Sequence, residues 1–171
     1  MDAVDVVKLA YAGSHMWYQG TIGNVTADQA NRAPPGVANP IGELAAHILQ
    51  CEDGMINMAI QGKPMIWERD GWGDKLGIPL MMNLPPAAAR DYKCDAQALQ
   101  EYAQAVYKNT EEYLNSLTPD DLDGAIDLTA MDMGKMKLGE FLMTMLLGNN
   151  YAHTGEISAL KGMQGEKGYP F

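Results

Sequence analysis

Cysteine and positive charge are both scarce in this chain of 171 residues. Its two cysteines, Cys51 and Cys94, are too few for a fold held together by disulfide bonds. Lysine and arginine number 12 against 22 aspartate and glutamate residues, which gives a formal net charge of −10. Nucleic acids and anionic membranes attract basic surfaces, so we expect neither of them as a main partner.

Long apolar runs and signature loops are missing as well. No segment approaches the roughly 18 apolar residues that a membrane-spanning helix requires. The first residues, Met1–Asp5, are acidic and lack the basic start of a secretion signal, so we expect a cytoplasmic protein. The chain has neither a glycine-rich phosphate loop nor a serine nucleophile elbow, so nothing indicates nucleotide binding or serine hydrolase chemistry.

Apolar residues at helical spacing, by contrast, are abundant. They predict helices over residues 4–20, 41–61, 95–116 and 138–163, with long connections between them. Alternating patterns typical of strands are scarce. With 47% hydrophobic residues, the chain is long enough to bury its own core as one domain over residues 1–171. The expected fold is therefore an all-α four-helix bundle.

A weak internal repeat relates the two halves of the chain. The tetrad Ile41–Leu44 resembles the tetrad Leu138–Phe141, and each begins a predicted helix. Each tetrad also follows a long helix and a turn that a threonine can cap, Thr26 in the first half and Thr118 in the second. This pattern predicts a bundle with pseudo-twofold symmetry.

Two connections carry unusual residues. The segment 62–91 contains Trp67 and Trp72 among several prolines and glycines, and a connection of this length is often functional. The tryptophans would either form a lid over a site or pack on the end of the bundle. In the last connection three methionines alternate, and we favour packing of a short extended segment over a soft apolar pocket: Met131, Met133 and Met136.

Polar residues interrupt the apolar stripes of the second and fourth helices. His47 lies in the second helix, and the inner stripe of the fourth changes from Met145 to Asn149, His153 and Glu156. Residues three and four apart on a helix are neighbours, so these three side chains share a face. Bundles build ligand and metal sites from such inward-facing polar groups, and a few ligands leave open positions on a metal for catalysis.

These segments resemble the DinB-like superfamily of four-helix bundles, which includes YfiT-like metal-dependent hydrolases and thiol S-transferases that use bacillithiol or mycothiol. The resemblance covers nearly the whole chain and is carried by three stretches: Pro40–Ile48, Leu117–Leu122, and Leu138–Leu142 leading to His153–Ile157. It implies a homodimer, a divalent metal such as zinc or nickel, and a low-molecular-weight thiol.

The resemblance also implies metal ligands. The family places one histidine on the second helix, which His47 matches, and a His-x-x-x-His pair on the fourth. His153 matches the second member of that pair, whereas Asn149 stands in place of the first. An amide oxygen binds nickel or zinc less well than imidazole does, so we expect weaker metal binding than at a three-histidine site.

Three other side chains are candidates to complete a metal site. Glu156 would give a set of two histidines and one carboxylate, and Cys51, four residues after His47, would suit zinc as a thiolate. His15 on the first helix is the third candidate. Two of them also have a favoured structural interpretation, Cys51 as core filling and His15 as a residue that caps the bundle beside Tyr11 and Tyr18.

Two functional classes remain open, and no catalytic residue is assigned. The first is a metal-assisted thiol S-transferase or hydrolase acting on a small electrophile, with His47 and His153 as ligands. The second is a non-catalytic bundle that binds a small molecule or dimerises and keeps a decayed metal site. The two histidines favour the first class, and Asn149 favours the second.

Overall fold

The computed structural model describes residues 1–81 and 90–171, and four long helical segments dominate it. Each begins and ends within two residues of its predicted bounds. They are α1 (Ala3–Ile22), α3 (Ile41–Asp53) continuing as the π-helix η1 (Gly54–Ile60), α7 (Ala96–Asn115), and α8 (Leu138–Glu140) continuing through the π-helix η5 (Phe141–Leu146) into α9 (Leu147–Met163).

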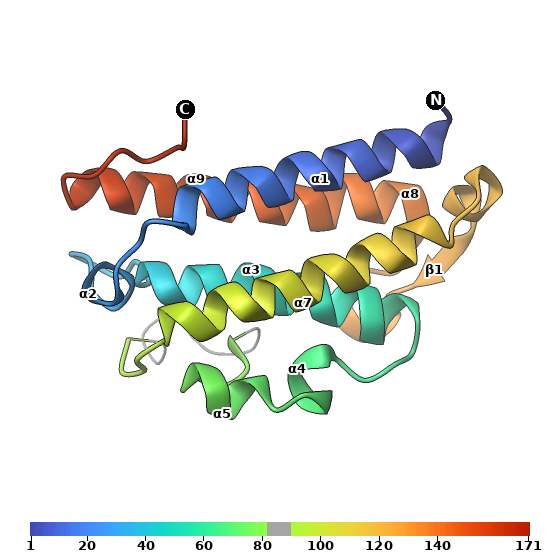
Figure 1. Ribbon diagram of the computed structural model, residues 1–171. Coiled ribbons are helices and arrows are strands. Elements are labelled where there is room, and N and C mark those ends of the chain that lie inside the picture. The colour runs from blue at the N-terminus through green and yellow to red at the C-terminus, as the bar shows by residue number, and fades with distance from the viewer. Residues whose placement is uncertain (82–89) are drawn as a thin grey trace.

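The four segments pack side by side as a bundle. Helices α1 and α3 each pack against both α7 and α9. Figure 1 shows that α1 and α9 run in one direction and that α3 and α7 run in the other. The expected all-α fold is thus confirmed. Among the described residues, no helix combines the length and the apolar character needed to cross a bilayer.

The connection before α8 contains a small antiparallel hairpin. Strand β1 (Ala125–Asp127) pairs with β2 (Lys135–Lys137), with Ile126 opposite Met136. Met133 and Met136 pack against the core, whereas Met131 is 39% exposed. The expected packing of an extended segment is therefore correct for two of the three methionines. The short helix η4 (Thr129–Met131) lies between the strands.

The predicted repeat is visible in how each half starts its second helix. Thr26 caps the short helix α2 (Ala27–Ala30) and Thr118 caps η3 (Pro119–Asp123), each through a capping box. A Cβ atom at Gly42 would lie 3.2 Å from the carbonyl oxygen of Ala30, four residues after the first threonine. The equivalent contact in the second half is equally close, because a Cβ at Gly139 would lie 3.2 Å from the Leu122 carbonyl oxygen. In both halves glycine lets the helix start rest on the capped turn.

The connection after η1 is partly helical, contrary to the predicted loop. It contains α4 (Ile66–Arg69) and α5 (Trp72–Leu76), which are too short to show a helical period in the sequence. Trp67 and Trp72 are buried, with ring centroids 5.4 Å and 5.3 Å from that of Tyr102 on α7. They pack on the bundle, as one of the two interpretations expected. The predicted loop also includes residues 82–89, which lie outside the described residues.

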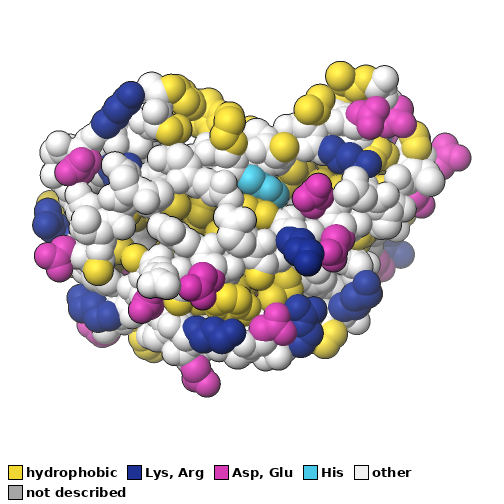
Figure 2. Space-filling model, viewed as in Figure 1, with side chains coloured by type: hydrophobic (Ala, Val, Ile, Leu, Met, Phe, Trp, Pro, Cys, Tyr) yellow, Lys and Arg dark blue, Asp and Glu magenta, His cyan; other side chains and the backbone are white. Residues whose placement is uncertain are grey.

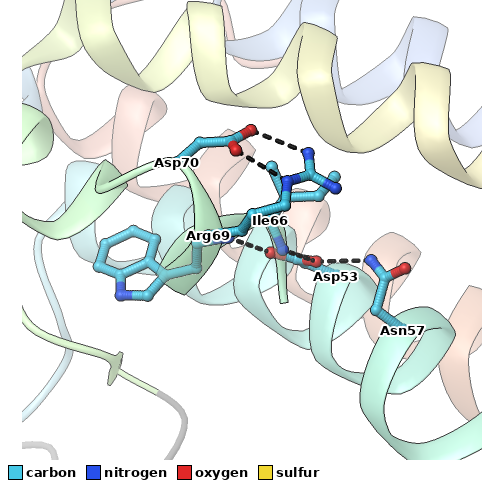
Figure 3. Close-up of polar contacts among 6 residues, drawn as sticks. Asp53, Asn57, Ile66, Arg69 and Asp70 are labelled. Carbon is cyan, nitrogen blue, oxygen red and sulfur yellow. Dashed lines mark hydrogen bonds and ion pairs between the residues drawn. The ribbon is translucent and has the colours of Figure 1, made fainter. Parts of the chain in front are cut away.

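Asp53, the last residue of α3, fastens this connection to the bundle (Figure 3). Its carboxylate accepts hydrogen bonds from the backbone N–H groups of Ile66 and Trp67, each at 2.9 Å. These are the first two donors of α4, which have no partner inside that helix. Asn57 at 2.8 Å and the Tyr102 hydroxyl at 2.7 Å complete its shell of donors. Asp53 is therefore fully paired although it is buried.

Candidate functional site

His47 and His153 lie together where α3 packs against α9. Their ring centroids are 4.9 Å apart and their planes are nearly perpendicular, at 86°. Both side chains are half-buried. The sequence predicted that these two imidazoles approach each other across the bundle, and the distance confirms it.

Glu156 orients the ring of His153. The Nδ1 atom of His153 lies 2.8 Å from Glu156 Oε2, and the carboxylate is 57% exposed. A carboxylate only accepts hydrogen bonds, so Nδ1 carries the proton and Nε2 of the neutral ring offers its lone pair. Glu156 therefore acts here on the far side of the ring, in the manner of the carboxylates that support metal-bound histidines.

The His47 imidazole is held in its neutral form. Burial lowers the pKa of His47, the neighbouring His153 lowers it further, and Glu156 partly offsets both effects. Cys51 lies beside this ring, with Sγ 3.4 Å from His47 Nε2. Burial raises the pKa of the Cys51 thiol to about 12, so the side chain is protonated at neutral pH. A protonated thiol is a poor metal ligand and a poor nucleophile.

A pocket of about 400 Å³ opens beside His153, between residues 37–39, the start of α3, and α9. Its walls are mostly apolar, with His153, Glu156 and Asn39 as the polar members. Within residues 1–81 and 90–171, buried Asn39 Oδ1 has no hydrogen-bond partner, and the same holds for Asn149 Nδ2 on α9, which does not line this pocket. Buried polar atoms are nearly always paired, so Asn39 is the lining residue at which the described part of the chain leaves a hydrogen bond unmade.

The donor atoms around the pair fit a metal ion only in part. Two imidazoles that share a tetrahedral zinc have centroids about 5 Å apart, which the 4.9 Å separation matches. The third position belongs to Asn149, an amide. Within residues 1–81 and 90–171, no three His, Cys, Asp or Glu side chains are grouped so as to hold a metal.

The sequence analysis missed a second polar cluster, centred on Glu52. This carboxylate is fully buried and accepts hydrogen bonds from all three other long segments. His15 Nε2 on α1 and Thr110 Oγ1 on α7 lie 2.8 Å and 2.7 Å from Glu52 Oε1. Asn150 Nδ2 on α9 donates to Glu52 Oε2 at 2.7 Å. The His15 ring also stacks on Tyr107 at 3.7 Å between centroids, so His15 belongs to this cluster and not to the pair formed by His47 and His153.

One signal in the sequence could have revealed this cluster. Glu52 and Asp53 are adjacent acids in the middle of a mostly apolar helix. Such residues are rarely buried unless they are paired, so they require donors from neighbouring helices. Their partners are scattered along the chain, and sequence spacing alone does not identify them.

The fold and the histidine pair together define a class of protein. It is a helical bundle in which two histidines meet between the second and fourth long segments. The family profile described as DinB superfamily matches residues 14–157, and the chain belongs to this superfamily.

The solved structures agree with this fold. A conserved protein from Enterococcus faecalis is similar, with a TM-score of 0.79 and 19% sequence identity over 97% of this chain and 99% of that chain. At this identity the likeness concerns the fold alone. No curated protein matches the chain.

Proposed function

We propose that this DinB-superfamily protein binds a small, uncharged molecule in the pocket lined by His153, next to the pair that His153 forms with His47. The observation that carries the proposal is the set of polar atoms left for a ligand there. Glu156 engages Nδ1 of His153 and leaves Nε2 for a ligand, and Asn39 Oδ1 is buried with no partner among the described residues.

The chemistry of the pocket selects the ligand. Val37, Ala38, Leu44 and Leu160 supply apolar walls that suit an apolar body. The unpaired oxygen of Asn39 accepts hydrogen bonds, so the ligand needs an O–H, N–H or S–H group. Glu156 would repel an anion. A small alcohol or thiol with an apolar substituent meets all three conditions.

Benzyl alcohol is a suitable probe for this proposal. We expect a saturable change in the ring NMR signals of His47 and His153 on its addition, while those of His15 stay constant. Benzoate, which replaces the donor by a negative charge, should bind at least about tenfold more weakly. Equal binding of the two probes, or no change at His153, would contradict the proposal.

A divalent metal is expected to bind here only weakly. Replacing one imidazole nitrogen by a neutral amide removes a ligand and loosens the hold on the other two. We expect Asn149→His to raise the zinc or nickel affinity by about 10- to 100-fold, measured by isothermal titration at neutral pH.

Ala152→His is the matched control for that measurement. It adds an exposed histidine next to His153 on the same helix, but adjacent residues do not share a helix face. This variant should leave the metal affinity near that of the unchanged protein. If the unchanged protein already binds zinc as tightly as Asn149→His, another side chain completes the site and the decayed-site interpretation is wrong.

A metal-assisted thiol S-transferase or hydrolase is the second candidate. One observation favours it: His47 is neutral and His153 is oriented by a carboxylate, which is how metal-binding histidines are prepared. A bound zinc or nickel would lower the pKa of a thiol or water. His47 and His153 would hold the ion and the apolar pocket would exclude water from an electrophile.

The two candidates differ in their dependence on metal. If the protein is such an enzyme, it should join a low-molecular-weight thiol such as bacillithiol or cysteine to the electrophile monochlorobimane. EDTA should abolish this turnover, and zinc or nickel should restore it. Loss of this turnover in His153→Gln would support it. Binding of benzyl alcohol without any such turnover would leave the non-catalytic binder as the function.

We further propose that the chain forms a homodimer. Exposed apolar side chains on α1, including Val6 and Met16, offer area for a second copy. Light scattering at micromolar concentration should then report twice the chain mass, and a monomer would contradict it.

A further inference from the structure

A groove of about 450 Å³ runs between α1 and α7, across the bundle from the face where α3 meets α9. Figure 2 shows this face of the molecule, hollowed along its middle with a histidine ring visible at the surface. The groove is lined by His15 and Tyr11 of α1 and by Tyr107 of α7, with Lys8 and Lys108 also contributing. Its volume lies within the range of small-molecule sites, about 300–1,000 Å³.

The His15 ring in this groove is held by the buried carboxylate of Glu52. Its Nε2 atom lies 2.8 Å from Glu52 Oε1, and Glu52 is completely buried. Thr110 and Asn150 donate to the same carboxylate. Because a carboxylate only accepts hydrogen bonds, Nε2 carries the proton. The bonds from Thr110 and Asn150 fix the Glu52 carboxylate, and the carboxylate in turn fixes the His15 ring.

The other nitrogen of this ring is available to a ligand. His15 Nδ1 has no hydrogen-bond partner among the described residues, and the side chain keeps 15% of its surface exposed. The ring is stacked on Tyr107 at 3.7 Å and meets the edge of Tyr11 at 6.0 Å. Nδ1 can form a hydrogen bond with a ligand hydroxyl, because a hydroxyl both donates and accepts.

The charges along the groove favour a negative ligand. Lys8 and Lys108 face it from opposite helices, with Glu111 as the single acid, so the lining carries a local excess of one positive charge in a protein of net charge −10. Lys108 is bound only loosely, 3.9 Å from an exposed Glu112. The aromatic rings of Tyr11 and Tyr107 offer surface to an apolar or aromatic body.

We propose that the groove between α1 and α7 is a second binding site, which takes a small aromatic carboxylate bearing a hydroxyl group. The hydroxyl forms a hydrogen bond with His15 Nδ1, the ring packs on Tyr11 and Tyr107, and the carboxylate pairs with Lys8 and Lys108. The distance fits such a molecule, because Lys8 lies seven residues before His15, or about 10 Å along the helix axis. This site is separate from the pocket of His47 and His153 and does not depend on it.

The probe that tests the site is 3-(4-hydroxyphenyl)propanoate. We expect saturable shifts in the ring NMR signals of His15, with those of His153 unchanged. 3-Phenylpropanoate, which lacks only the hydroxyl, should bind about five- to tenfold more weakly, because one hydrogen bond to His15 is lost. Shifts at His153 instead of His15, or equal affinity for the two acids, would overturn the proposal.

Two exposed lysines give a matched pair of variants that do not threaten folding. Lys108→Met should weaken binding of the hydroxy acid about two- to fivefold, as expected for one solvent-exposed charge. Lys63→Met removes an exposed charge outside the groove and should change nothing. An identical effect of both variants would show general charge attraction and would overturn the proposed site.

Discussion

The bundle contains two pairs of a histidine and a carboxylate with the same 2.8 Å contact and opposite surroundings. In the closed pair, Glu52 is fully buried and its oxygens accept from His15 and two further side chains. In the open pair, Glu156 is 57% exposed and holds only His153. The same contact therefore ties helices together in one place and only orients a half-buried ring in the other.

What separates the two pairs is the number of donors around each carboxylate. A buried charge is stable only when its lone pairs are matched, and the closed pair meets this condition with groups from all four long segments. The open pair relies on water for the rest. The difference teaches that a contact between a histidine and a carboxylate does not by itself indicate a function. Unpaired polar atoms next to the contact are the more informative feature.

The largest expected effect comes from breaking the closed pair. Glu52→Gln places an N–H group among donors that need an acceptor, so we expect it to lower the free energy of unfolding by about 3–5 kcal/mol. Glu156→Gln, its counterpart in the open pair, should cost less than about 0.5 kcal/mol. Urea unfolding of both variants measures these free energies. Similar losses of stability would contradict the proposed difference between the closed and the open pair.

Asp53 provides a third case, a buried carboxylate without a histidine. Asp53→Asn keeps one acceptor but turns an amide towards the donors of α4 and Tyr102, and we expect a loss of about 2–4 kcal/mol. Hydrogen exchange should become faster first at the backbone amides of Ile66 and Trp67. Unchanged protection at these amides would show that other contacts hold α4.

Glu43 is a buried carboxylate that receives no hydrogen bond from the part of the chain that the structure describes, and it should respond to pH. Burial raises the pKa of Glu43 from 4.5 to about 7 in the folded protein, with Arg90 and Lys93 partly opposing this. Between these pH values the unfolded chain ionises and the folded protein does not, so Glu43 lowers stability as pH rises towards 7.

The variant Glu43→Gln isolates this effect. Its stability relative to the unchanged protein should increase between pH 4.5 and pH 8 by on the order of 1–3 kcal/mol. Urea unfolding at both pH values measures it. A constant difference would mean that Glu43 finds a partner in solution.

The smallest expected effects concern His47 in the open pair. Its pKa is lowered by burial and by His153 and raised by Glu156. NMR titration should therefore give a midpoint below 6.5 that rises in His153→Gln and falls further in Glu156→Gln. Movements of the midpoint in the opposite directions would show that His153 and Glu156 do not act on His47 through their charges.

The sequence was sufficient to predict the four long helices, because they follow from strong apolar periodicity. The meeting of His47 with His153 was predicted from their positions on the helical stripes together with the resemblance to the DinB-like superfamily. It failed at the inner stripe of the last helix, where it placed Met145 and Asn149. The structure exposes 45% of Met145 and buries Leu146 and Asn150 instead. The cause is η5, because a π-helical turn accommodates one extra residue and shifts the stripe by one position.

The partners of Glu52 were unpredictable for another reason. His15, Thr110 and Asn150 are each separated from it by 37 to 98 residues. Long-range pairing depends on how the helices rotate against one another, and the spacing of residues within a helix carries no such information.

Because of the π-helical segment η5, the packing of α9 depends on the exact number of residues between α8 and α9. Loss of a single residue there would restore α-helical geometry and turn all of α9 by about 100° relative to α8. Asn150 would then lose its contact with Glu52, and His153 would lose its contact with His47, so one deletion would break both polar clusters. Substitutions can alter the side chains around His47 and His153 one at a time, whereas a deletion in η5 can only be tolerated if an insertion nearby restores the count.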